Sequence, residues 1–133
     1  MSSIIITNYI LARNTAVKAF VATRVYPVQA PQSPTFPYIT TNEISSRQHD
    51  LINVPGKYYR DRVTVECISK SATEAILMGR AVMDCLEGVL NQSFGEYKDI
   101  SIRFADVGFS DSNDVSDAFR DLKQFFVWWR SKD

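Results

Sequence analysis

Hydrophobic side chains near the start of the chain recur at the spacing of a helix. Ile6 and Ile10 belong to this series, and Asn14, a residue type that caps helices, interrupts it. The pattern predicts two short helices, over residues 3–13 and 15–22, with a bend between them.

The clearest predicted element is a helix in the middle of the chain. Ser71 and Glu74 have the spacing of a capping box, in which the serine oxygen accepts a hydrogen bond from the backbone three residues on and the glutamate reaches back. Behind them an apolar face repeats at i, i+3 and i+4, and it comprises Ala75, Met78, Gly79, Val82, Cys85, Leu86, Val89 and Leu90. We expect a helix from Ala72 to Leu90, with its glycine where another element approaches closely.

Alternating apolar and polar residues predict strands in the rest of the chain. Four are expected, over Tyr38–Ile44, Asp61–Ser69, Ile100–Phe104 and Ala118–Arg130. A proline-rich connector precedes the first, and its fixed backbone excludes a helix there. The polar stretch Ser45–Arg60 is expected to be a long loop, and Phe109–Asp114 a polar turn.

The last strand is ambiguous, because its apolar residues also match helical spacing. The unbroken aromatic and β-branched run Phe125–Trp129 favours the strand. A strand sets Phe126 and Trp128 on one face and Phe125, Val127 and Trp129 on the other. Since a layer of helices covers only one face, the second apolar face needs another copy or another protein. We therefore predict an interface that includes Phe125, Val127 and Trp129.

Taken in order, these elements describe a single α+β domain over residues 1–133. It would hold an antiparallel four-stranded sheet with helices packed on one face. The hydrophobic fraction of 45% is sufficient for a core, and 15 basic residues balance 15 acidic ones. A neutral chain argues against a protein that binds nucleic acid by neutralising phosphates, although a local basic patch stays compatible with it.

Cysteine content and hydropathy bear on the compartment of the protein. Cys67 and Cys85 both lie among apolar neighbours and are expected to be reduced core thiols. No signal-peptide pattern and no apolar stretch of the ~20 residues that a membrane span requires are present. We expect a soluble protein of a reducing compartment, with no metal and no cofactor.

Candidate chemistry is sparse. His49 and Asp50 are adjacent in the predicted loop, an arrangement that seldom orients a catalytic pair, and no glycine-rich phosphate loop is present. The aspartates at 106, 111, 114 and 117 lack the spacing of a calcium loop. We therefore expect no enzyme, and a hydrolase using His49 and Asp50 is the least favoured alternative.

Tyr58 and Tyr59 alternate with the basic residues Lys57, Arg60 and Arg62. Such surfaces stack single-stranded bases, and aromatic residues are also enriched at protein interfaces. The neutral charge of the chain favours the protein interface. Its predicted residues are His49, Asp50, Tyr58 and Tyr59, together with those of the terminal strand.

The order of these signals resembles the tail terminator, or tail completion, proteins of long-tailed bacteriophages. The resemblance lies in Thr23-Arg24-Val25-Tyr26-Pro27 after the N-terminal helices, in Arg62-Val63-Thr64-Val65-Glu66-Cys67, in the capped helix, and in the closing aromatic strand. It implies a virion protein assembled in the host cytoplasm. Such proteins form a ring, typically a hexamer, on the head-proximal end of the tail tube, and they need no catalytic residue.

The resemblance also implies the partners. They are further copies of the chain, the tail tube protein and the head connector or stopper, with no membrane and no sequence-specific nucleic acid. The ring would end tube polymerisation and provide the surface on which the connector docks. Another ring component of the neck or tail tube is the first alternative, and a single-stranded nucleic-acid-binding module is the second.

Overall fold

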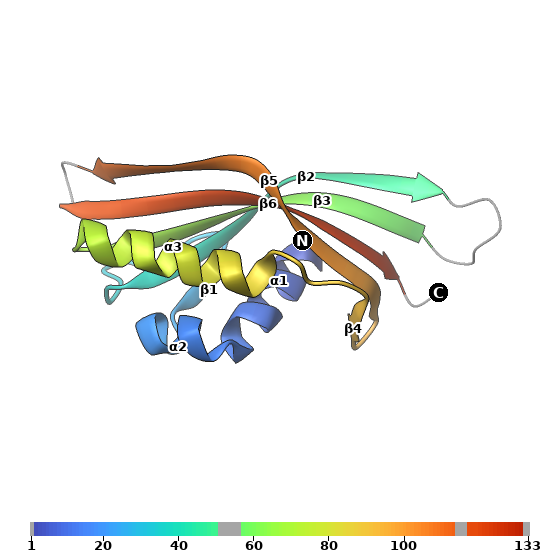
Figure 1. Ribbon diagram of the computed structural model, residues 1–133, viewed down its shortest axis with the longest axis horizontal. Helices are drawn as coiled ribbons and strands as arrows, with labels where there is room; N and C mark the ends of the chain where they lie inside the picture. The colour runs from blue at the N-terminus through green and yellow to red at the C-terminus, as the bar shows by residue number, and fades with distance from the viewer. Residues whose placement is uncertain (1, 51–56, 114–116, 132–133) are drawn as a thin grey trace.

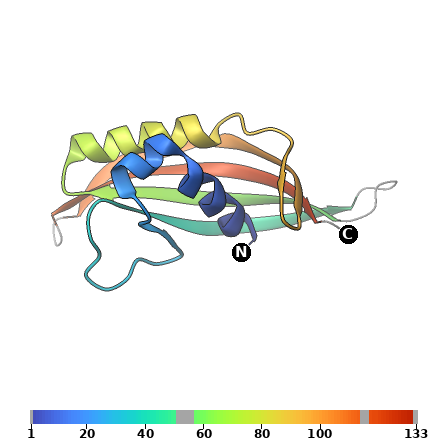
Figure 2. The same cartoon turned by 90° about the horizontal axis from the view of Figure 1, so that it is seen from below.

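The computed structural model describes residues 2–50, 57–113 and 117–131. Three helices lie on one face of a twisted six-stranded sheet (Figure 1). The elements, in chain order, are α1 (Ser2–Arg13), α2 (Thr15–Val21), β1 (Val25–Pro27), β2 (Tyr38–Asp50), β3 (Lys57–Ser69), α3 (Ala72–Leu86), β4 (Gln92–Phe94), β5 (Tyr97–Asn113) and β6 (Ala118–Ser131). Figure 2 shows the helices as one layer and the sheet as the other.

The sheet is larger than predicted, and its strand directions are mixed. The strand order is β1-β2-β3-β6-β5-β4, and β1 runs parallel to β2 while every other neighbour is antiparallel. The prediction of an antiparallel four-stranded sheet was therefore wrong. Both additional strands have three residues, too few for an alternating pattern to be recognised, and β1 ends at a proline.

Two of the predicted irregular stretches are in fact strand. β2 runs on to Asp50 and β3 begins at Lys57, so most of the predicted loop Ser45–Arg60 is a hairpin arm with Arg47 opposite Arg60. The arm extends past the helices (Figures 1 and 2), where no apolar face has to be buried, and its strands therefore lack alternation. Residues 51–56 lie outside the described residues.

The predicted polar turn Phe109–Asp114 is also wrong over its described part. β5 continues to Asn113, which pairs with Ala118 of β6. Asp114 lies outside the described residues. Serine, aspartate and asparagine are typical of turns, but here they occupy the far end of a long antiparallel pair.

The helices confirm the sequence pattern with one difference in length. The Asn14 side chain accepts a hydrogen bond from the Val17 N–H at 3.0 Å, and the Ser71 hydroxyl accepts one from the Glu74 N–H at 3.3 Å. Glu74 itself accepts from Ser69 Oγ instead of reaching back to Ser71, so only half of the capping box forms. α3 ends at Leu86 rather than Leu90, and Gly88 follows with a left-handed backbone (φ +87°).

The core lies between the helices and the inner face of the sheet. Its largest fully buried side chains include Ile6, Leu11, Met78 and Phe125. Gly79 of α3 packs directly on β6, because a Cβ built there would stand 1.7 Å from an Asp121 carboxylate oxygen. The close approach predicted at Gly79 is therefore confirmed.

Cys67 is buried and Cys85 is half-buried, and both are free thiols. Among the described residues, no helix combines the length and the apolar character needed to cross a bilayer.

Candidate interaction surfaces

The face of the sheet opposite the helices carries two half-buried aromatic side chains, Phe126 and Trp128 of β6. Their ring centroids lie 5.7 Å apart. The guanidinium groups of Arg60 and Arg62, from the neighbouring β3, each lie 5.3 Å from the centroid of the Phe126 ring. Cations over an aromatic face are attracted by its quadrupole, so the arginines hold the aromatic pair in place without covering it completely.

Further arginines extend this surface across the sheet. Arg47 of β2 stands directly opposite Arg60, and Arg103 of β5 stands directly opposite Phe126. Arg62 donates a 2.7 Å hydrogen bond to Gln124. Within the described residues, Arg47, Arg60 and Arg103 form no ion pair. We call the set Arg47, Arg60, Arg62, Arg103, Phe126 and Trp128 the outer-face patch.

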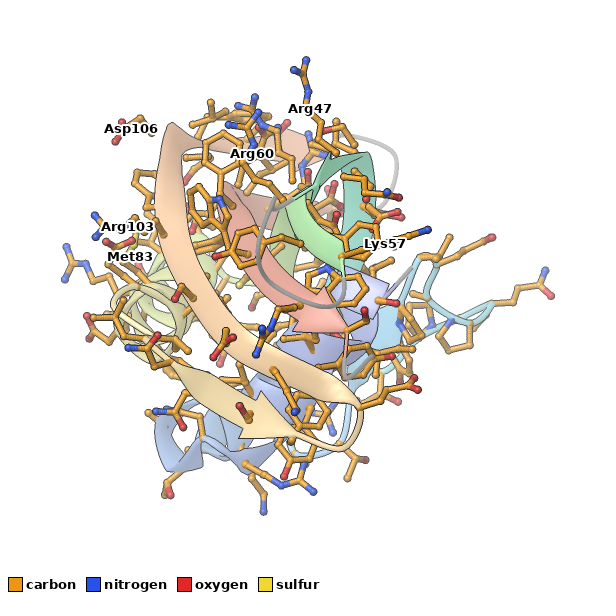
Figure 3. All side chains as sticks on the ribbon, turned by 90° about the vertical axis from the view of Figure 1, so that its right-hand side faces the viewer. Arg47, Lys57, Arg60, Met83, Arg103 and Asp106 are labelled. Atoms are coloured by element: carbon orange, nitrogen blue, oxygen red, sulfur yellow. The ribbon has the colours of Figure 1, made fainter. Side chains whose placement is uncertain are left out.

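The patch concentrates four positive charges on a chain whose net charge is zero. Like charges directly opposite each other on two strands are unfavourable, and Arg47 with Arg60 is such a pair. Figure 3 shows these two side chains at the top of the view and Arg103 at its left margin. A surface built in this way fits an acidic partner.

The structure places the predicted terminal-strand residues on the inner face of the sheet. Phe125, Val127 and Trp129 are all buried by the helices and by their own neighbours. The face of β6 that remains accessible to a partner is therefore the one with Phe126 and Trp128. The alternation was predicted correctly, but the sequence pattern does not say which of two apolar faces the helices take.

The predicted tyrosines point to opposite faces of β3. Tyr59 stacks on Trp129 with ring centroids 4.4 Å apart, next to the core. Tyr58 lies between the end of β2 and Arg130 of β6, and burial raises the pKa of its hydroxyl, with the charge of Asp99 adding to the effect. Only Tyr58 is therefore placed on the outer face.

His49 and Asp50 form the end of β2, where their backbone pairs with Tyr58 and Lys57. Their side chains lie outside the described residues. Of the predicted interface residues, His49 and Tyr58 stand directly opposite each other on β2 and β3. Phe125 and Val127 instead belong to the core between the helices and the sheet.

A buried polar network fixes the base of the β2–β3 hairpin arm. Trp129 Nε1 donates a 2.9 Å hydrogen bond to the fully buried Asp61, and Ser46 Oγ donates to the other carboxylate oxygen. Nearby, Ser3 Oγ of α1 donates to Glu43 at 2.7 Å. Burial raises the pKa of the Asp61 carboxyl, against the lowering effect of its hydrogen bonds, and the nearby Glu43 charge raises it further. These bonds connect α1, β2, β3 and β6 where the arm leaves the body.

The other candidate groups carry structural roles. Burial raises the pKa of the Cys67 thiol, and it raises that of Cys85 to about 11, so neither is a thiolate at neutral pH. Asp111 forms a bidentate pair with Arg120, with nitrogen–oxygen distances of 3.0 and 2.5 Å, and these bonds lower the pKa of the carboxyl. Across the described ranges, no cluster of histidine, cysteine and acidic residues has the arrangement of a metal site.

Sequence reasoning missed Arg47 and Arg103 as parts of one surface. The available signal was the hairpin register, since extending the strand pattern back from Asp61 would have set Arg47 against Arg60. Phe126 and Trp128 were recognised as sharing a face, but that face was not assigned to the interface.

Comparison with known proteins identifies the family. The family model described as "Tail completion protein gp17" matches residues 9–130. No curated protein matches the chain by sequence. A chain in the solved virion of a native gene transfer agent (GTA) particle is similar in fold, with 18% identity and a TM-score of 0.71, over 94% of this chain and 92% of that one. A second solved structure has 14% identity and a TM-score of 0.50, over 98% and 96% of the two chains.

At these identities the two solved structures establish the fold alone. The family model carries the assignment, because it spans nearly the whole domain, from α1 to the end of β6. The chain therefore belongs to the tail completion protein gp17 family and is a structural protein of a phage tail.

Proposed function

We propose that this protein forms a ring on the head-proximal end of the phage tail tube. The ring ends tube polymerisation and provides the docking surface for the head connector or stopper. The observation that carries the proposal is the match to the tail completion family over residues 9–130. The proposed location is the neck of the virion, after assembly in the host cytoplasm.

The shape of the subunit supports a role between two different partners. The β2–β3 hairpin and the β5–β6 hairpin turn at opposite ends of the sheet (Figure 1). A ring of such subunits presents one set of hairpins at each end, so its two rims differ. A terminator needs this property, since one rim must bind the tube and the other must not continue it.

Within this proposal the β2–β3 arm, residues 45–50 and 57–60, reaches a neighbouring subunit or the tube. It carries Tyr58, His49 and Asp50, and it projects beyond the helices (Figure 2). The outer-face patch is the second proposed contact surface, in place of the buried Phe125, Val127 and Trp129. A head-to-tail contact between identical subunits generates a closed ring when its rotation closes, and we propose a hexamer.

Electron microscopy of tails assembled without this protein tests the proposal. Overlong tubes are expected, because nothing stops the addition of tube subunits. Absent tubes would instead indicate a tube protein, and tubes of normal length joined poorly to heads would indicate another neck component. Adding the purified protein back should restore the normal length.

The outer-face patch favours one second candidate, a module that binds single-stranded nucleic acid. Phe126 and Trp128 offer stacking surfaces, and Arg60 and Arg62 lie beside them. Binding of a labelled oligonucleotide that weakens steeply with salt would support this candidate. An absence of binding at low salt would exclude it.

A further inference from the structure

Two stretches of strand edge lack a neighbouring strand within the described residues. β1 pairs with β2 only at Ile39–Thr41, which leaves residues 42–50 open on that side. At the opposite margin, β4 pairs with β5 only near Tyr97 and Ile100, and the segment after α3 bonds to Ile102. Residues 105–113 of β5 are therefore open as well. We call these stretches the β2 edge and the β5 edge.

Open edges of this length are templates for the addition of another strand, and soluble proteins normally protect them. Each edge here also exposes a large apolar side chain. Ile44 of the β2 edge is 52% exposed and Phe109 of the β5 edge is 47% exposed. Strand edges without a neighbouring strand and exposed apolar side chains thus occur together at both margins of the described sheet.

Among the described side chains, each edge carries a charged group that forms no ion pair, Arg47 on the β2 edge and Asp106 on the β5 edge, and these two charges are opposite. The β2 edge also contains Glu43, which accepts a hydrogen bond from Ser3. The β2 edge carries Arg47, which faces Arg60 and has no acidic partner among the described residues. The β5 edge carries Asp106 and Asp111, of which Asp111 is already paired with Arg120. Figure 3 shows Arg47 and Asp106 at separate margins of the molecule. The two charges cannot neutralise each other within one copy, but they can between two.

Strand directions allow the edges of two copies to meet. β2, β3, β6 and β5 are successive antiparallel neighbours, so β2 and β5 run in opposite directions. A second copy placed beside the first in the same orientation therefore sets its β2 antiparallel to the first copy's β5. The contact is head-to-tail, because each copy uses its β2 edge to bind one neighbour and its β5 edge to bind the other.

The two open stretches lie at different levels along the strands. The register across the four long strands shows this. Ser46 of the β2 edge lies in one row with Asp61, Val127 and Ile102, so its counterpart on β5 is Ile102. Phe109 of the β5 edge lies in another row, with Leu122, Glu66 and Thr40. β1 and β4 block a continuation at the same level, so pairing requires an offset along the strand direction. An offset of this kind is what closes a sheet into a barrel with tilted strands.

We propose that neighbouring copies of this chain pair the β2 edge of one with the β5 edge of the next. The strands are antiparallel and staggered, and the subunit sheets join into one continuous sheet around the ring. The occupant of each edge is a second copy of the chain, selected by the opposite charges of Arg47 and Asp106 and by the exposed apolar side chains of Ile44 and Phe109. This inference rests on the proposed ring and specifies how it closes.

Lysine substitutions at the two edges test the pairing. Ile44→Lys blocks the β2 edge and Phe109→Lys blocks the β5 edge. Ile76→Lys changes a residue of comparable exposure (42%) on α3 and serves as the control. Native mass spectrometry from micromolar to high micromolar concentration should find oligomers for the unmodified chain and for Ile76→Lys. Each edge variant should be monomeric, with at least a tenfold weaker association.

Mixing the two edge variants gives the decisive result. Ile44→Lys retains its β5 edge and Phe109→Lys retains its β2 edge, so the mixture should form one-to-one dimers that do not extend. Circular dichroism and thermal unfolding confirm that both variants are folded. A mixture that stays monomeric, edge variants that assemble normally, or an unmodified chain that is monomeric throughout would each overturn the proposal.

A charge exchange provides an independent variant set. Arg47→Asp alone and Asp106→Arg alone should each weaken assembly, and the double variant should recover most of it. Failure of the double variant to recover any assembly counts against the pairing. The assembly tests use purified protein and do not depend on the tail-length experiment. If tails made without the protein had normal length, the proposed terminator function would be wrong, but the proposed edge pairing would still stand. If both lysine variants assembled normally, the edge pairing would be wrong, but the terminator function would still stand.

Discussion

The part of the sheet beneath the helices and the β2–β3 arm beyond them consist of the same strands but have different side-chain patterns. Beneath the helices, Val63 stands opposite Phe125 and both are buried. In the arm, Arg47 stands opposite Arg60. The pairs beneath the helices stabilise the folded monomer, whereas Arg47 and Arg60 repel each other and contribute nothing to it. From this comparison we predict that substitutions beneath the helices affect stability, whereas substitutions in the arm and at the open edges affect assembly.

Substitution of the two neighbouring phenylalanines of β6 tests this comparison most strongly. Phe125→Ala should lower the free energy of unfolding by about 3–5 kcal/mol, because it opens a cavity in the core. Phe126→Ala, on the other face of the same strand, should cost far less. Urea unfolding of both variants measures the difference, and equal losses would show that the outer face is also part of the core.

Gly79 tests the packing of α3 on the sheet. Gly79→Ala should destabilise the monomer by about 1–3 kcal/mol, since the new methyl group would collide with the Asp121 carboxylate. Gly108→Ala is the matched control, because the nearest atom to its Cβ is 3.4 Å away. A stabilised Gly79→Ala variant in thermal unfolding would contradict the close packing found here.

Asp61 tests the junction between the body and the arm. Asp61→Ala leaves the Trp129 N–H without its partner and should cost about 1–3 kcal/mol, whereas Asp61→Asn retains an acceptor and should cost less.

The same residue predicts a pH dependence. Burial raises the pKa of folded Asp61, so the folded chain holds this proton more tightly than the unfolded chain does. The stability that it contributes is complete below the unfolded pKa of about 4 and declines as pH rises through the folded pKa. The stability of the unmodified chain relative to Asp61→Asn should therefore fall as pH rises above about 4 and then level off. Parallel stability curves for the two proteins would refute this sign.

The smallest effect is expected in the arm. Arg60→Gln removes one of two opposed positive charges and also the cation–π contact with Phe126, and since these effects are similar in size and opposite in sign, monomer stability should change by less than about 1 kcal/mol. Arg120→Gln, which breaks the pairs with Asp111 and Glu66, is the comparison variant and should not stabilise. Thermal unfolding of the monomer distinguishes them, and a loss of more than about 1 kcal/mol for Arg60→Gln would place the arm within the stabilising body.

Local chemistry accounts for the parts of the fold that were predicted correctly. Asn14 and Ser71 cap their helices by contacts within one turn, and Gly79 lies on the apolar stripe that faces the sheet. The four long strands were recognised where one face is buried, because burial imposes alternation. Where the strand residues are exposed, as at Arg47 and Asp111, that constraint is absent, and strand was mistaken for loop and turn.

The candidate surface was less accessible to prediction. The alternation in Phe125–Trp129 defines two faces but not which one the helices occupy, since both are apolar. That choice depends on the packing of α1 and α3 against β3, β5 and β6, which involves residues far apart in the chain. The aromatic run and the family resemblance nonetheless pointed to this strand.

The amino-acid pattern alone was thus sufficient for the helices, their caps, the alternation of the long strands and the resemblance to a tail completion protein, because these depend on neighbours within a few residues. Pairing between distant strands was needed for the rest. It set Arg47 against Arg60, turned Phe125 inward and Phe126 outward, and left an edge open on each side of the sheet. Such pairings form only when the chain folds back on itself, so no short stretch of residues contains them.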